Sequence, residues 1–362
     1  MCMASQSDLV EAFRKQARAC DELGSPFMAA LLDRAARELD RTGSIGGLLT
    51  SWSGDPVRDA VPLRLAAALH SLVLSGSDSN LAALYPSSDR AGDADAVWGA
   101  ALAAIKGHRE DVEAFLSSPP QTNEVGRSAV LLGGFLEIAR VTGGRPMRTL
   151  EIGASAGLNL LWDRYRYELG GRAHWGHADS SVVVQADWEG PLPPLEAHAV
   201  VAERAGSDSE PVDLGDEQAR LRLRAYVWAD QPARMALLDA AIALVRQEKI
   251  QVEREEAAAW VEKRLQAPAP GCATVLYHSI AWEYFPQETK SHIRSTVEEA
   301  GARADAASPL AWLRLEPSSN GGPGGGQPEL RLTLWPGGRE RCLARAHTHG
   351  PPVTWLESSS NE

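Results

Sequence analysis

The stretch Met147-Arg-Thr-Leu-Glu-Ile-Gly-Ala-Ser-Ala-Gly-Leu-Asn-Leu160 decides the fold of this 362-residue chain. Its short apolar run ends at Glu151. Small residues then occupy alternate positions, at Gly153, Ser155 and Gly157, before a helical pattern begins. Small residues at a strand-to-helix turn either let a ligand approach the backbone or present a serine on a strained elbow. The first interpretation predicts a nucleotide-type cofactor site, and the second predicts a hydrolase.

The chain changes character at this stretch. Before it, apolar periodicity and capping residues predict helices only, over 27–39, 63–74, 94–116 and 127–140 as well as near the start. After it, strands alternate with helices. The predicted strands are Arg148–Ile152, Val182–Gln185, His198–Ala202, Ala273–His278, Leu310–Leu315, Leu330–Leu334 and Cys342–Ala346. The predicted helices are Leu158–Tyr165, Glu217–Tyr226, Gln231–Val245, Glu253–Leu265 and Thr289–Ala300.

This order of elements predicts an α/β fold with a mostly parallel sheet covered by helices on both faces. The last three strands follow one another without helices, which predicts an antiparallel end to the sheet. We expect a helical N-terminal region over 1–120 and an α/β domain over 121–362. A Gly170-Gly171 turn and alternating tyrosines predict a small β insertion over about 163–190.

Composition limits the partners of the protein. The formal net charge is −12 and the pI is near 5.3, and clustered Lys and Arg, on which nucleic-acid binding relies, are missing. No apolar run is long enough to cross a membrane, and the first residues do not resemble a signal peptide. The four cysteines lack the paired spacing of zinc or redox motifs. We expect a soluble, cytoplasmic protein that acts on a small molecule, and the oligomeric state stays open.

The hydrolase interpretation rests on Gly153-Ala-Ser-Ala-Gly157, which matches the nucleophile elbow Gly-x-Ser-x-Gly. Asp216 and either His278 or His347 follow in the order that a triad requires. An elbow serine, however, lies in mid-sheet and needs several strands before it, and the region before Met147 reads as helical. The hydrolase with Ser155 as nucleophile is therefore the alternative, and a tight turn that only allows close packing is another.

The cofactor interpretation fits the position of the motif on the first strand of its domain. A dinucleotide motif, Gly-x-Gly-x-x-Gly, is not met, because Ser155 and Leu158 stand where glycines are needed. The pattern Glu-x-Gly-x-Ser-x-Gly resembles the first motif of class I methyltransferases, which bind S-adenosylmethionine. The resemblance implies a Rossmann-like sheet with antiparallel end strands, and a strand-end acid and loop that hold the methionine part of the cofactor. The residues concerned are Glu151, Gly153, Ala154, Ser155, Gly157 and Asn159.

Further motifs resemble one bacterial family as a set. They are Asn123-Glu-Val-Gly-Arg127, Glu151 to Asn159, Val227-Trp-Ala-Asp-Gln231, His278-Ser-Ile-Ala-Trp282, Leu334-Trp-Pro-Gly-Gly338 and His347-Thr-His-Gly350. The family is the domain of unknown function 2332 (DUF2332), and the similarity extends from the N-terminal helices to Trp355. It implies the same methyltransferase-like fold.

Residues at the ends of other strands complete the expected site, because ligands of such sheets lie at the carboxyl ends of the strands. His278 ends the fourth parallel strand, where it is predicted to act as base or to position the acceptor, with help from Glu283. Ser279, Trp282 and Tyr284 are expected to line the substrate pocket, since aromatic faces suit a sulfonium cation. A strand-end histidine bonded to a nearby carbonyl is the alternative interpretation.

The cofactor's other groups have candidates as well. Glu203 or Asp208, following the strand His198–Ala202, is expected to bind the ribose hydroxyls. Asn123 and Arg127 would share one face of a helix, from which Arg127 could pair with the cofactor's carboxylate.

A metal is not expected. His347 and His349 would share a strand face, but a third or fourth ligand is missing. The leading hypothesis is a methyltransferase for an unidentified small molecule. Besides the hydrolase, the alternative is a binding protein with the same fold and no catalysis.

Overall fold

The computed structural model divides into two compact units. The described residues are 4–41, 45–49, 52–86, 93–318 and 326–356. The helical unit comprises Met1–Thr122 and Gly215–Ala236, and the α/β unit comprises Asn123–Leu214 and Leu237–Glu362. The stretch Gly215–Ala236, which the sequence pattern assigns to the α/β domain, thus belongs with the helices.

The helical unit is built around one apolar core. Its described helices are α1 Gln6–Glu22, α2 Pro26–Arg41, α3 Gly46–Leu49, α4 Val61–Leu74, α5 Ser79–Ala82, α6 Ala94–Gly107, α7 Arg109–Ser117, α9 Glu217–Ala225 and the start of α10 Pro232–Gln247. Helices α1 to α7 supply most of the core, and the buried side chains of Tyr226 and Trp228 complete it. The carboxylate of Asp230 accepts hydrogen bonds from the Ser25 hydroxyl and from the N–H of Phe27 in α2. These contacts explain why a late segment of the chain joins the early helices.

One predicted helix is two helices in the structure. The periodicity over 94–116 predicts a single helix, but α6 ends at Gly107 and α7 begins at Arg109. Between them His108 leaves the helical region, with φ −122° and ψ 39°. Glycine is a poor helix former, so the chain breaks where Gly107 lowers the cost of doing so.

The α/β unit contains a large, mostly parallel sheet. Its strands, in spatial order among the described residues, are β5 Trp188–Glu189, β12 Gly350–Trp355, β11 Arg339–His347, β10 Pro328–Trp335, β9 Leu310–Pro317, β8 Ala273–Ser279, β1 Met147–Ile152, β6 Val201–Asp208 and β7 Glu253–Arg254. The pairs from β7 through to β9 are parallel. The pairs from β9 to β12 are antiparallel, as the helix-free end of the sequence predicts.

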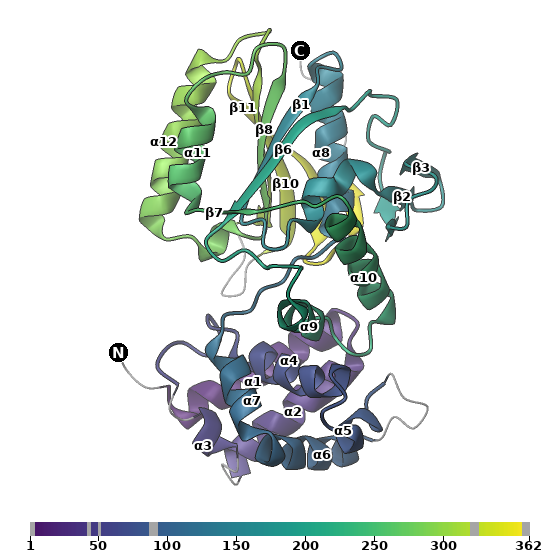
Figure 1. Ribbon diagram of the computed structural model, residues 1–362, viewed down its shortest axis with the longest axis vertical. Coiled ribbons are helices and arrows are strands. Elements are labelled where there is room, and N and C mark those ends of the chain that lie inside the picture. The colour runs from purple at the N-terminus through teal and green to yellow at the C-terminus, as the bar shows by residue number, and fades with distance from the viewer. Residues whose placement is uncertain (1–3, 42–44, 50–51, 87–92, 319–325, 357–362) are drawn as a thin grey trace. The chain divides into compact units, whose positions relative to one another are not determined.

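Helices cover both faces of this sheet (Figure 1). Helices α11 Ala257–Leu265 and α12 Gln287–Arg303 lie side by side on one face, where their apolar residues pack on β1, β8 and β9. Helix α8 Arg127–Val141 covers the other face. A Cβ atom at Gly133 would approach Trp355 to 2.3 Å, and one at Gly134 would approach Leu313 to 2.5 Å. This glycine pair therefore lets α8 lie close to the sheet.

Smaller elements complete the unit. A second sheet of β2 Arg166–Leu169, β3 Ala173–Gly176 and β4 Val183–Ala186 lies within the stretch predicted as a β insertion. Gly170 and Gly171, with φ of 57° and 65°, form the turn between its first two strands. The helix predicted over 158–165 is instead the 3-10 helix η1 Leu158–Arg164, and η2 Trp282–Tyr284 is another. Across the described residues, no helix is both long and apolar enough to cross a membrane.

The strand predicted at 198–202 is displaced along the sequence. The apolar residues there suggest a strand that ends at Ala202, but β6 runs over Val201–Asp208. Its polar residues are accommodated by pairing: Arg204 donates two hydrogen bonds to the Asp163 carboxylate, of 2.6 and 3.0 Å. Glu203 is therefore in mid-strand, and Asp208 is at the carboxyl end.

Candidate functional site

The turn after β1 adopts the left-handed backbone conformation at three residues. The φ angles are 68° at Gly153, 52° at Ser155 and 74° at Gly157. This conformation costs serine about 1 kcal/mol or more, whereas glycine adopts it freely. A Cβ atom at Gly153 would also lie 2.6 Å from the Cβ of Ala281, in the segment after β8. Glycine is thus required at position 153 both by the backbone and by close packing.

Side chains of the protein accept hydrogen bonds from this turn. The N–H of Ser155 donates to Asp208 Oδ2 at 2.9 Å, and the N–H of Leu158 donates to Asn123 Oδ1 at 2.9 Å. The sequence pattern predicts a helix start at this turn with free N–H groups for a ligand, and at Leu158 this expectation is wrong. Asp208, from β6, and Asn123 instead hold the turn in place.

Glu151 is buried directly below the turn. Its side chain is 1% exposed, and the hydroxyl of Tyr277, on the neighbouring strand β8, donates to Glu151 Oε2 at 3.3 Å. The same hydroxyl lies 3.3 Å from the carbonyl oxygen of Asn159. Burial raises the pKa of Glu151 to about 8, against the opposing effect of the Tyr277 hydrogen bond. Near neutral pH the carboxyl group is thus largely protonated.

His278, at the end of β8, forms a close pair with Glu316 at the end of β9. His278 is fully buried, and its Nδ1 lies 2.6 Å from Glu316 Oε1. The imidazole ring stacks on Trp282, with ring centres 5.2 Å apart and planes at 14°. Its other nitrogen, Nε2, is buried and has no hydrogen-bond partner among the described residues. A strand-end histidine bonded to a carbonyl, the alternative interpretation, is therefore replaced by a histidine bonded to a carboxylate.

The segment after His278 is strained. Ile280 has a φ of 48°, which is rare for a β-branched residue, and its N–H donates to the carbonyl of Leu315 at 2.8 Å. Glu316 Oε1 also accepts the N–H groups of Ala281 and Trp282, at 3.1 and 3.2 Å. One carboxylate thus positions both the imidazole and the strained segment beside it.

Arg127, the first residue of α8, joins the end of β8 to the turn between β11 and β12. Its Nε donates to the carbonyl of Thr348 at 2.9 Å, and its Nη1 donates to the carbonyl of Ser279 at 3.1 Å. The residue is 7% exposed. Asn123 precedes α8 rather than lying in it, so the predicted shared helix face is wrong. The two residues nevertheless serve the same edge, since Asn123 binds the turn after β1.

Other predicted residues are more exposed than Glu151 and His278. Glu203 is exposed in mid-β6, where it pairs with Arg148 at 3.2 Å. Tyr284 is 72% exposed, so it does not wall a buried pocket, and Glu283 beside it is exposed as well. His347 has its ring centre 5.1 Å from that of His349. In the described part of the chain, no three His, Cys, Asp or Glu side chains gather as a metal site requires.

Two residues of the cluster, Glu316 and Tyr277, were not predicted from the sequence. Glu316 follows directly on the predicted strand Leu310–Leu315, and an acid in that position is a signal that could have been used, because neighbouring parallel strands end at the same edge. Tyr277 lies within the predicted strand Ala273–His278, where no sequence signal distinguishes it from the apolar residues. Its hydroxyl meets Glu151 because the two are paired across β1 and β8.

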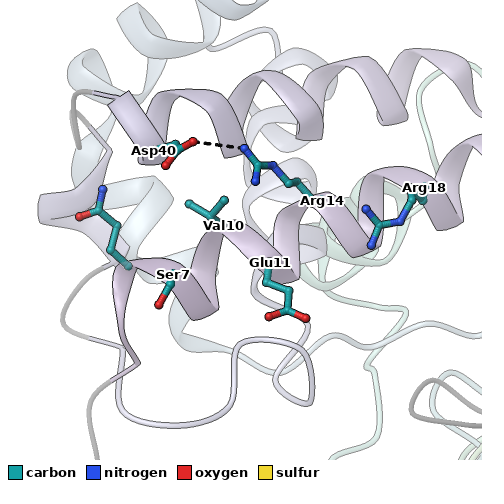
Figure 2. Close-up of a pocket in the computed structure, with 7 residues that line it drawn as sticks. Ser7, Val10, Glu11, Arg14, Arg18 and Asp40 are labelled. Carbon is teal, nitrogen blue, oxygen red and sulfur yellow. Dashed lines mark hydrogen bonds and ion pairs between the residues drawn. The ribbon is translucent and has the colours of Figure 1, made fainter.

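The helical unit has a hollow of its own, between α1 and α2 (Figure 2). Its volume is about 550 Å³. The residues around it are Gln6, Ser7, Val10, Glu11, Arg14, Arg18 and Asp40. Arg14 and Asp40 form an ion pair of 3.2 Å across it, with side chains 46% and 60% exposed. An exposed ion pair of this kind contributes little free energy. The buried polar groups at the sheet edge are therefore the better candidates for a functional site.

Fold and site together define an α/β protein with a polar site at the carboxyl edge of a mostly parallel sheet. A family model described as "Uncharacterized protein conserved in bacteria (DUF2332)" matches residues 10–355. The chain belongs to this family, as the motifs noted above indicate. Comparisons with curated proteins and with solved structures gave no match.

Proposed function

We propose that this protein is an S-adenosylmethionine-dependent methyltransferase that acts on a small molecule. The observation that carries the proposal is the order of the parallel strands, β7-β6-β1-β8-β9. In chain order these are the third, second, first, fourth and fifth strands, which is the Rossmann-type order. The strand order reverses between β1 and β8, and ligands of such sheets bind at the carboxyl ends beside this switch point.

The residues at that edge suit the groups of the cofactor. Asp208 ends the strand next to β1, where an acid serves ribose hydroxyls. The turn at 153–157 would hold the methionine part, and Arg127 would face its carboxylate. Once bound, S-adenosylmethionine supplies an activated methyl group on a sulfonium sulfur. The protein's own task is then to orient the acceptor, exclude water and take up a proton.

Buried polar atoms support a polar ligand at this edge. Ser155 Oγ, Asn159 Oδ1 and His278 Nε2 are all buried without hydrogen-bond partners among the described residues. Unpaired buried groups of this kind are costly, and a ligand that bonded to them would offset part of the cost. Ala281 lies against the backbone of Gly153, where a Cβ atom at position 153 would otherwise be.

The alternative is a serine hydrolase with Ser155 as nucleophile. The positive φ of Ser155, 52°, favours it, because an elbow serine is strained. Against it, neither Ser155 Oγ nor His278 Nε2 has a hydrogen-bond partner in the part of the chain that the structure describes, so they are not bonded to each other as nucleophile and base should be. Only helix α8 precedes β1 in the described part of this unit, whereas an elbow serine follows several strands.

The deciding experiment is isothermal titration calorimetry of the full chain with S-adenosylmethionine and S-adenosylhomocysteine. We expect binding of both. No heat at millimolar ligand, with protein shown to be folded by circular dichroism, would rule the proposal out. Binding without methylation of any acceptor would favour the non-catalytic binding protein.

A second measurement distinguishes the hydrolase. A fluorophosphonate probe should leave the wild-type protein unlabelled, and Ser155→Ala should bind S-adenosylmethionine nearly as well as the wild type. Labelling that Ser155→Ala abolishes would establish the hydrolase instead.

A further inference from the structure

We propose that Glu316 positions His278 as a general base, with the proton on Nδ1 and the lone pair on Nε2, for an acceptor that carries a proton on its attacking atom. The inference rests on the proposed function for the acceptor class alone. The pairing of the two side chains is independent of any ligand.

The geometry fixes which nitrogen carries the proton. Glu316 Oε1 lies 2.6 Å from His278 Nδ1, and it also accepts the backbone N–H groups of Ala281 and Trp282. An oxygen that accepts two N–H groups is an acceptor toward its third neighbour as well, so Nδ1 carries the proton. In a neutral imidazole the other nitrogen then holds a lone pair.

The surroundings hold the ring in one orientation. His278 is fully buried, stacks on Trp282 and lies at 57° to Trp312, with ring centres 6.1 Å apart. A backbone bond to the same carboxylate ties Trp282 in place. An imidazole that a carboxylate orients, with its second nitrogen unbonded to any described residue, matches the arrangement of a general base.

The chemistry of the step defines the acceptor. The attacking atom bonds to the transferred methyl group as the bond from sulfur to that methyl breaks, and the sulfur keeps the electron pair. The proton of the attacking atom passes to His278 Nε2, and Glu316 stabilises the resulting imidazolium. A base of this kind serves a hydroxyl group or a protonated amine, whereas an acceptor without such a proton, such as a thioether, has no use for it.

The test is the protonation of His278 by long-range 1H–15N NMR of the full chain, with 15N-labelled histidine and no ligand. The chain has nine histidines, and His278→Gln identifies the signal by its loss. We expect a protonated Nδ1 and an unprotonated Nε2. A proton on Nε2, with or without one on Nδ1, would overturn the inference.

Two variants separate positioning from mere structural support. Glu316→Leu removes the acceptor and should transfer the proton to Nε2, the form that free imidazole side chains favour. An unchanged spectrum in this variant would overturn the role of Glu316. Glu340→Gln is the matched control, because Glu340 lies on the same sheet and pairs with Arg314 rather than with His278. It should leave the His278 signals where they are.

The NMR experiment tests the positioned base and the calorimetry tests the proposed function, so either can give a negative result without the other. Without S-adenosylmethionine binding, the proposed function falls, while the NMR result still identifies a base for another reaction. If S-adenosylmethionine binds but His278 Nε2 carries a proton, the proposed function stands and only the role of His278 as a positioned base is rejected. If Glu316→Leu does not fold, the wild-type spectrum alone still decides whether Nε2 is free to accept a proton.

Discussion

The backbone of Gly153 lies against the side chain of Ala281, so that the turn after β1 packs closely on the segment after β8. A left-handed backbone and a packing contact meet at this one glycine, which has a φ of 68°. The two requirements can be measured separately, because the chain contains glycines that meet only one of them.

Gly153→Ala should lower the free energy of unfolding by about 2–4 kcal/mol, the sum of the left-handed strain and of overpacking. Urea denaturation followed by circular dichroism measures the loss. Gly171→Ala is the control, since Gly171 has a φ of 65° and a Cβ atom added there would have no neighbour within 4 Å. It should lose only about 1 kcal/mol. Adding Ala281→Gly to Gly153→Ala should restore the packing part. Equal losses in both single glycine variants would show that the contact has no energetic weight.

The stability of the protein should depend on the protonation of Glu151. Burial raises its pKa to about 8 in the folded state, from an ordinary value of 4.5. Between these values the unfolded chain has released the proton and the folded protein keeps it. The free energy of unfolding therefore falls as pH rises from about 4.5 to about 8.

Glu151→Gln removes this contribution, because the amide stays neutral. The variant should resemble the wild type near pH 4 and should be more stable than it at pH 8, by on the order of a few kcal/mol. Urea titrations at several pH values measure both curves. Parallel curves for the two proteins would contradict the assignment of the shift to Glu151.

Arg127→Met should cost about 2–4 kcal/mol of stability, because two charge-assisted hydrogen bonds, to Thr348 and Ser279, are lost from a buried position. Arg127→Lys should cost less. The control is Arg345→Met, which removes a 3.5 Å ion pair with Glu329 from a side chain that is 54% exposed. That change should cost less than about 1 kcal/mol. Similar losses for Arg127→Met and Arg345→Met would mean that the bonds of Arg127 to Thr348 and Ser279 do not stabilise the protein.

If the proposed function holds, Asp208→Asn should weaken S-adenosylmethionine binding about 10- to 100-fold, because the proposed charge-assisted hydrogen bond to the ribose would be worth about 1.5–3 kcal/mol. Glu203→Gln should leave the affinity unchanged, since Glu203 lies in mid-strand and pairs with Arg148. Calorimetry measures both, and circular dichroism checks that the turn held by Asp208 survives. A loss of affinity in Glu203→Gln alone would place the ribose elsewhere.

Apolar strands were predictable because their burial on both faces leaves continuous apolar runs. Strands β8 and β9 contain such runs, whereas the apolar residues of β1 and β10 are interspersed with polar ones. All four lie where the sequence predicts them, within a residue or two at each end. The displaced strand β6 shows the limit of this signal. Its residues Arg204 and Ser207 are polar, and Arg204 fits a sheet because it bonds to Asp163 and to the carbonyl of Leu160, 41 and 44 positions away in sequence.

In the site, too, some residues can be predicted from the sequence and others cannot. The glycine turn and His278 lie at the ends of predicted strands, so local patterns place them at this edge. Asp208 lies at the same edge only because β6 extends beyond the predicted strand end at Ala202. The partners of these residues depend on register and tertiary packing, which a single sequence does not display. Glu316 meets His278 only because β8 and β9 pair in parallel with His278 opposite Arg314. Ala281 meets Gly153 only through the strained conformation of Ile280.

The inclusion of Gly215–Ala236 in the helical unit bears on how the protein is made. A ribosome releases the first helices long before it reaches residue 236, yet Tyr226 and Trp228 belong to their core. Part of the apolar surface of the nascent helices therefore stays exposed until the ribosome has synthesised β1 to β6 and the segment that contains Tyr226 and Trp228. A fragment that stops at residue 122 would keep that surface uncovered for good, so dividing this chain for expression requires both of its helical segments.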